Sequence, residues 1–213
     1  MSMARALHRP IVAFACAAAC ALAAGEPIDV QVDKRGDIVT VDVQARTTIE
    51  PHLAWAVLTD YEHMPRYVSA VKSSTVRHTG PHSLEVDQVV ETRVAFMDIK
   101  VSSVRNVELT PPREVRSNLL RGDFKRYEFV TRVEPQPGGG TLITHHGEYV
   151  PNAWLPPMIG PAVIRQQTEQ QYRELIAEME RRAGSSGGRP STAPAERAAE
   201  HAPAKRDDAA RGR

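Results

Sequence analysis

The chain has very little cysteine. Of its 213 residues only Cys16 and Cys20 are cysteines, and both lie close to the N-terminus. If that segment is removed, the mature chain has no thiol. Disulfide bonds, cysteine-ligated metals and thiol nucleophiles are then excluded. A domain of this length can be stabilised by its apolar core alone.

An excess of either charge is also missing. The chain has 27 Lys and Arg against 26 Asp and Glu, a formal net charge of +1. This balance gives no electrostatic reason to expect a nucleic-acid partner. With 41% hydrophobic and 25% charged residues, the composition is typical of one ordinary globular domain with a real core.

The only long apolar run is at the N-terminus, and it is too short to span a membrane. Basic residues (Arg5, Arg9) precede Ile11 to Ala24, about 14 mostly alanine residues against the roughly 20 that spanning needs. Ala21-Leu22-Ala23 then gives a cleavage pattern. We predict a secretory signal peptide over residues 1–24 and a periplasmic or secreted protein. A lipoprotein signal is disfavoured, because three alanines precede Cys20.

Large apolar residues are absent from the C-terminus. Gly184 to Arg213 contains no Ile, Leu, Val, Met, Phe, Tyr or Trp. Such a segment cannot bury enough apolar surface to offset chain entropy. We predict a disordered tail over residues 184–213 and one folded domain over residues 26–183.

Alternating apolar and polar residues dominate the folded part. They predict antiparallel strands at Ile28–Val32, Ile38–Val43, Val71–His78, Ser83–Phe96, Ile99–Leu109, Glu114–Leu120, Phe124–Val133 and Thr141–Val150. A short helix is expected from Pro51, and helical spacing predicts a long amphipathic helix over Ala162–Arg182. The predicted fold class is α+β, a curved antiparallel sheet wrapped round the C-terminal helix.

Two stretches resemble a known superfamily. VLTDYEHMPRYVSAV and GDFKRYEFVTRVEPQPGGGTLITHHGEYVPN are similar to the START-like (SRPBCC) superfamily, in its polyketide cyclase/dehydrase and coenzyme Q-binding branch. The resemblance covers roughly Thr40 to Arg182. It implies a helix-grip fold in which a seven-stranded sheet and the last helix enclose an apolar cavity. Members of the superfamily bind sterols, lipids, quinones, polyketides or hormones, and some catalyse cyclisation.

The segment TDYEHMPRYV is dense in polar and aromatic groups. The residue types are those of a turn. Asp60 can accept hydrogen bonds from backbone N–H groups, and Pro65 fixes its own φ angle. Tyr61 and Tyr67 can pack their rings against the core while their hydroxyls stay at its polar edge. We interpret the segment as a structural corner between helix and sheet, which forms one rim of the pocket.

The long strand predicts the wall of that pocket. Gln88 and Thr92 are polar residues on its apolar face. They either bond to one another, to other inward groups or to ordered water, or they present hydrogen bonds to a ligand. A proline-bounded apolar loop before the last helix is either a cap on the core or a gate. The predicted cavity-lining residues are Tyr67, Gln88, Val90, Thr92, Val94, Phe96, Trp154, Met158, Ile164 and Thr168.

Recognised catalytic, metal and cofactor motifs are missing. His145 and His146 are neighbours on a predicted strand and point to opposite faces, so they cannot chelate one ion. No G-x-S-x-G occurs, and the glycines of Pro137-Gly138-Gly139-Gly140 form a turn and not a phosphate cradle. No metal or cofactor is expected. Arg105, either histidine and Glu148 are the plausible titratable groups of the cavity, and their inward or outward direction stays open.

These observations favour an exported, non-catalytic binding or carrier protein for a hydrophobic small molecule such as a lipid, quinone or polyketide-like compound. The alternative is a cyclase or dehydratase acting in the same cavity, which needs an acid and a base within reach of the substrate. A protein-interaction module would need a cytoplasmic location, against the predicted signal. No nucleic-acid partner is expected, and transient membrane contact stays open.

Overall fold

The computed structural model describes residues 28–94, 97–152 and 160–186. The predicted signal peptide lies outside the described residues, as do residues 187–213 of the predicted tail. Among the predicted site residues, Phe96, Trp154 and Met158 also lie outside. No helix of the described residues is long and apolar enough to cross a membrane.

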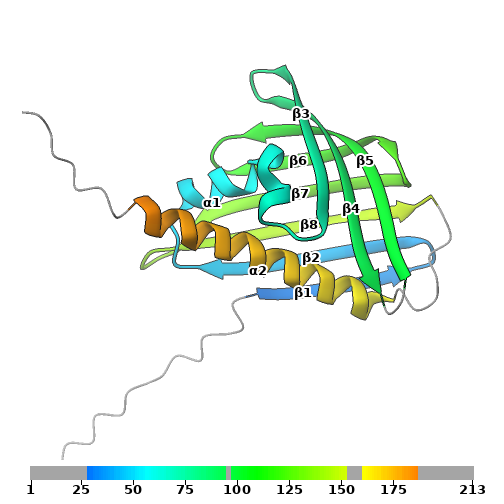
Figure 1. Ribbon diagram of the computed structural model, residues 1–213. Coiled ribbons are helices and arrows are strands. Elements are labelled where there is room, and N and C mark those ends of the chain that lie inside the picture. The colour runs from blue at the N-terminus through cyan, green and yellow to red at the C-terminus, as the bar shows by residue number, and fades with distance from the viewer. Residues whose placement is uncertain (1–27, 95–96, 153–159, 187–213) are drawn as a thin grey trace, which may run out of the picture.

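One antiparallel sheet forms most of the fold (Figure 1). Its strands are β1 (Ile28–Arg35), β2 (Ile38–Thr47), β3 (Val71–Gly80), β4 (Ser83–Val94), β5 (Met97–Thr110), β6 (Glu114–Gly122), β7 (Phe124–Pro135) and β8 (Thr141–Pro151). Their spatial order is β1-β2-β8-β7-β6-β5-β4-β3. The sheet has eight strands, as the alternation predicts, and not the seven that the resemblance implied.

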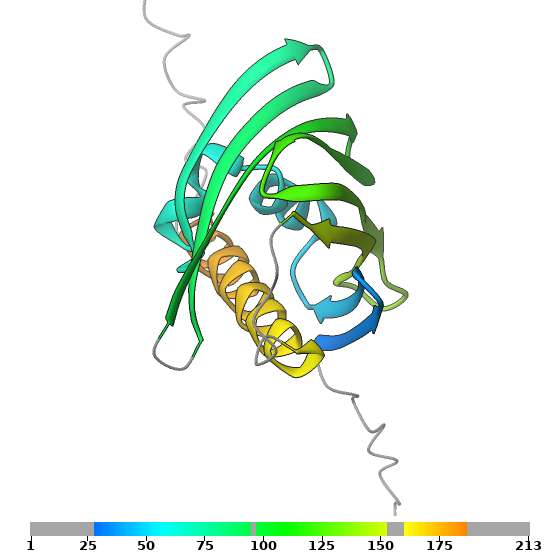
Figure 2. The same cartoon turned by 90° about the vertical axis from the view of Figure 1, so that its right-hand side faces the viewer.

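The described residues also form three helical elements: α1 (Pro51–Leu58), the 3-10 helix η1 (Tyr61–Arg66) and α2 (Pro161–Ser186). Pro51 lies in the first turn of α1, where its missing N–H costs nothing. The sheet curves around α2 (Figure 2), so the predicted helix-grip fold is confirmed. The helix runs four residues further than its apolar spacing predicts.

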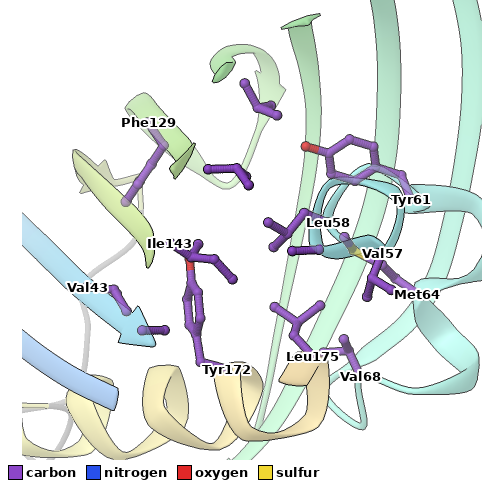
Figure 3. Packing of buried hydrophobic residues seen from close by; sticks show 14 of the residues in the cluster. Val43, Val57, Leu58, Tyr61, Met64, Val68, Phe129, Ile143, Tyr172 and Leu175 are labelled. Atoms are coloured by element: carbon purple, nitrogen blue, oxygen red, sulfur yellow. The ribbon is translucent and has the colours of Figure 1, made fainter. Parts of the chain in front are cut away.

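The apolar core lies between the sheet and α2. Tyr172, Leu175 and Met179 of α2 are buried, and they belong to the same cluster as Val43 of β2 and Ile143 of β8 (Figure 3). Inward residues alternate along each of these strands, which places the valines and isoleucines on the concave face. Most of the buried cluster therefore comes from β-branched residues of the sheet and from the middle and C-terminal part of the helix.

Gly147 of β8 allows an aromatic ring to lie flat on the concave face. A Cβ at this position would lie 2.1 Å from the carbonyl oxygen of Glu128 and 2.6 Å from the ring of Phe129. No side chain fits there unless β7 moves. The glycine thus fixes the position of Phe129 over β8.

The TDYEHMPRYV corner is tied to the end of α2. The Asp60 carboxylate lies 2.6 Å from Nδ1 of His63 and accepts a hydrogen bond of 2.7 Å from Arg182, which also donates to Glu178 at 2.7 Å. We call Asp60, His63, Glu178 and Arg182 the corner clasp. The prediction that Asp60 accepts backbone N–H bonds is wrong, because its oxygens face these side chains.

The corner clasp should respond to acid through Glu178. Hydrogen bonds from Arg181 and Arg182 outweigh burial and lower the pKa of Glu178 from 4.5 to about 2. A lowered carboxylate pKa stabilises the fold above the ordinary pKa, and this contribution is lost as the pH falls through the folded value.

We therefore expect Glu178→Gln to lower the free energy of unfolding by about 1–3 kcal/mol at neutral pH. The deficit relative to the wild type should shrink between pH 4.5 and about 2. Urea unfolding at several pH values measures both. Glu180→Gln, an exposed position on the same helix, is the control and should cost less than about 0.5 kcal/mol. A deficit that stayed constant down to pH 2 would contradict the assigned role.

Candidate functional site

A cavity of about 700 Å³ lies between the concave face of the sheet, the corner and α2. Figure 3 shows side chains from three directions around this space: Leu58 of α1 and Tyr61 of the corner, Phe129 from β7, and Tyr172 and Leu175 from α2. Strands β4 to β8 supply most of the remaining wall. Apolar side chains predominate, as in most small-molecule sites.

Five of the predicted lining residues lie on this cavity: Gln88, Val90 and Thr92 from β4, and Ile164 and Thr168 from α2. Tyr67 is not among the lining residues. Its hydroxyl lies within hydrogen-bond distance of the backbone oxygens of Val57 and Asp60, at 3.2 and 3.0 Å, and the Arg182 guanidinium lies over its ring. Tyr67 thus belongs to the outer side of the corner. Val94 ends β4, and its side chain is not described.

Arg105 faces the cavity, which settles a direction that the sequence left open. It is only 8% exposed. A bulge near Ser102 and Ser103 would have turned it outward, but the extra residue of the β5–β6 ladder lies in β6, at Leu120. The inward parity of β5 is therefore kept, and Leu120 is pushed out to 52% exposure.

Neutral groups surround the Arg105 guanidinium. Nη2 donates to Oε1 of Gln88, and Nη1 lies 3.4 Å from the hydroxyl of Tyr127. The guanidinium also lies over the rings of Tyr61 and Tyr127, 5.9 and 5.5 Å from their centroids. Cation–π contacts of this kind partly offset the loss of hydration.

Gln88 holds Arg105 in place and is itself fully engaged. Its Nε2 donates to Oγ of Ser74 at 3.0 Å, while Oε1 accepts from Arg105. The Gln88 amide therefore forms hydrogen bonds with other inward side chains of the protein, which is the first of the two alternatives that the sequence left open. The Thr92 hydroxyl also lines the cavity and has no hydrogen bond to a described residue.

An aromatic wall lies beside Arg105. Tyr127, Phe129 and Tyr149 come from β7 and β8, and the rings of Tyr127 and Phe129 lie 4.5 Å apart. Burial raises the pKa of Tyr61 and of Tyr149 to about 12, so their hydroxyls stay protonated at neutral pH and can donate hydrogen bonds. These residues were not among the predicted ones, although Tyr127 and Phe129 share one parity in FKRYEFV.

His145 and His146 point to opposite faces, as strand geometry predicts. Nδ1 of His145 lies 2.8 Å from Oγ1 of Thr131, and its ring stacks on Phe129 at 4.7 Å. Burial, helped by the charge of Arg105, lowers the pKa of His145 from 6.5 to about 4. His146 lies on the outer face, 2.5 Å from Asp42. The described residues contain no group of three or more possible metal ligands.

The described part of the wall offers no carboxyl group suited to act as a general acid. Glu148 pairs with Arg126 at 2.5 Å and is not a lining residue. Asp123 lines the cavity, but the backbone N–H and hydroxyl of Ser102 donate to it and lower its pKa. Of the titratable groups expected from the sequence, Arg105 and His145 are the ones that reach the cavity.

Residues 39–184 match the family model described as polyketide cyclase / dehydrase and lipid transport. The chain belongs to this family. A search of curated proteins gave no match.

Solved structures of the START/SRPBCC superfamily share the fold of this polyketide cyclase / dehydrase family member. The Zhui aromatase/cyclase from Streptomyces sp. R1128 is 18% identical, with a TM-score of 0.60 over 71% of this chain and 99% of that one. A STAR-related lipid transfer protein from Xanthomonas axonopodis is 13% identical, with a TM-score of 0.60 over 73% and 94%. Human STARD10 is 10% identical, with a TM-score of 0.60 over 76% and 73%. The family and the cavity together indicate hydrophobic ligand binding.

His145 should be neutral throughout the physiological range. We expect its ring resonances to stay constant from about pH 8 to about pH 5.5 and to titrate only near the value of about 4. Because this pKa lies below that of the unfolded chain, the buried ring should destabilise the fold as the pH falls below 6.5. NMR titration measures this, with His145→Gln to assign the signal. A midpoint near 6.5 would place the ring in solvent.

Proposed function

We propose that this chain is an exported binding or carrier protein that holds one hydrophobic small molecule in the internal cavity and does not transform it. The observation that carries the proposal is a cavity of about 700 Å³ whose described wall is mainly apolar. The family description, which includes lipid transport, supports it.

The size of the cavity limits the ligand. At the roughly 30 Å³ that a water molecule occupies in the liquid, about 700 Å³ corresponds to roughly 23 non-hydrogen atoms. A single-chain lipid or a polyketide-like ring system of that size fits. A diacyl phospholipid has about twice as many atoms and would extend beyond this volume.

A cyclase or dehydratase is the second candidate. It is supported by the family description and by the polar groups of Arg105, Tyr127 and His145 on one side of the cavity. Mass spectrometry separates the two functions. The compound that co-purifies with the protein is extracted, identified and incubated again with the protein. Recovery of the unchanged compound supports a carrier, whereas its conversion to a dehydrated or cyclised product supports the enzyme.

Occupation of the cavity can be tested with a matched pair of substitutions. Val90→Trp places an indole into the cavity, and Val89→Trp places the same group on the opposite face of β4. We expect Val90→Trp to lower the affinity for Nile red, a neutral apolar probe, at least roughly tenfold, because the ring takes up ligand volume. Val89→Trp should bind like the wild type. Equal binding by both variants would place the probe outside the cavity.

Export is part of the proposal and rests on the N-terminal sequence. Expressed in a bacterium with a periplasm, the protein should be recovered from that compartment with Ala24 or Gly25 as its first residue. N-terminal sequencing of the periplasmic fraction measures this. An intact chain that starts at Met1 and stays in the cytoplasm would refute export while leaving the binding function untouched.

A further inference from the structure

Arg105 is a buried cation whose hydrogen-bonding capacity the described residues do not fill. The side chain is 8% exposed, and its Nε has no hydrogen-bond partner among the described residues. Ser117 on the neighbouring β6 is 6% exposed, and no described residue forms a hydrogen bond with its Oγ. Both residues line the cavity. Unpaired polar atoms at such depth are costly, and two of them in one wall indicate a polar subsite.

No carboxylate of the described residues forms an ion pair with Arg105. The carboxylate on the cavity wall, Asp123, is held by Ser102, and the nearby histidine, His145, is uncharged at neutral pH. The contacts of the guanidinium are the Gln88 oxygen, the Tyr127 hydroxyl and two aromatic faces. None of these groups is an anion, so the positive charge in the wall is uncompensated there.

We propose that Arg105 and Ser117 receive the carboxylate end of an amphiphilic acid with a single apolar body; this deepens the proposed binding function and rests on it. The planar guanidinium is suited to the two oxygens of a carboxylate, and the Ser117 hydroxyl adds a donor. Gln88 accepts from one nitrogen of Arg105 and so fixes the direction of the guanidinium.

The apolar body has a defined path from this subsite. Along β5, the inward residues that follow Arg105 toward the β4–β5 connection are Ser103, Val101 and Ile99, and all line the cavity. Val90 of β4 pairs with Val101, and Ile164 belongs to the first turns of α2. The acid therefore binds with its charged end buried in the middle of the sheet and its chain along these residues.

The test compares an acid with its neutral counterpart in the full-length protein. Displacement of Nile red is measured with hexadecanoate, hexadecanol and hexadecyl sulfate, for the wild type, Arg105→Met, Arg105→Gln and Ser117→Ala. We expect the wild type to bind hexadecanoate with at least roughly tenfold higher affinity than hexadecanol, because hydrogen bonds to a charged group are stronger than those to a neutral one. Both Arg105 variants should lose that preference, which is measured as the ratio of the two affinities within each variant. Arg93→Met, exposed on the outer face of β4, is the control and should keep the preference.

Each other outcome overturns a distinct statement. Equal affinity for hexadecanoate and hexadecanol in the wild type would refute the subsite and leave the apolar cavity intact, and this comparison needs no variant. Binding of hexadecyl sulfate as tight as that of hexadecanoate would refute a carboxylate site in favour of a general anion site. Failure of the wild type to bind Nile red or any of the chains would refute the binding function itself. Thermal melts within a few degrees of the wild type show that the variants are folded.

Discussion

The width of the sheet relative to one helix is the constraint on which the structure depends. Eight strands at about 4.8 Å spacing span about 34 Å, whereas a helix with its side chains is about 10–12 Å across. One helix cannot cover the apolar face of such a sheet. The sheet must curve, and α1 and η1 must cover part of the remainder. The space that they leave uncovered is the cavity, which is therefore a consequence of the width of the sheet relative to the helix.

The helix is used unequally along its length. Its middle and C-terminal part pack into the core through Tyr172, Leu175 and Met179, and its end is held by Arg182 in the corner clasp. Its N-terminal half lines the cavity with Ile164, Thr168 and neighbouring residues that are only partly buried. Stability is thereby concentrated at one end of the helix. Residues 161–170 of the helix include no fully buried side chain, and elements with few buried side chains open at the lowest cost in free energy.

Period-two alternation carries most of what could be predicted from the sequence. It gave all eight strands and the inward face of β4, including Gln88 and Thr92, because one buried face imposes a strict parity. Parity could not decide Arg105, since a bulge reverses the faces beyond it, and which of two paired strands contains the bulge depends on the pairing. The extra residue lies at Leu120 in β6, so Arg105 stays inward.

Tyr67 shows a different limit of prediction from the sequence. An aromatic residue at the edge of a predicted pocket was assigned to its lining, but backbone oxygens at the turn engage its hydroxyl. The direction of a side chain at a corner follows from the local backbone and not from a repeating pattern. The aromatic residues that do line the cavity, such as Tyr127 and Phe129, lie on regular strands, where alternation would have identified them.

The polar subsite is where the needs of folding and of binding differ. An apolar residue in place of Arg105 would occupy the same inward position without desolvating a charge, and such replacements are often neutral or stabilising. The ligand-free fold thus gains little from a buried guanidinium and a nearby Ser117 hydroxyl when no described residue pairs with the Nε of the one or the Oγ of the other. An acid that binds there supplies the missing anion and fills the volume that α2 leaves open. Because it binds only the folded chain, it also shifts the folding equilibrium toward the closed grip. Ligand binding and the stability of the sheet around α2 are in this way one linked equilibrium.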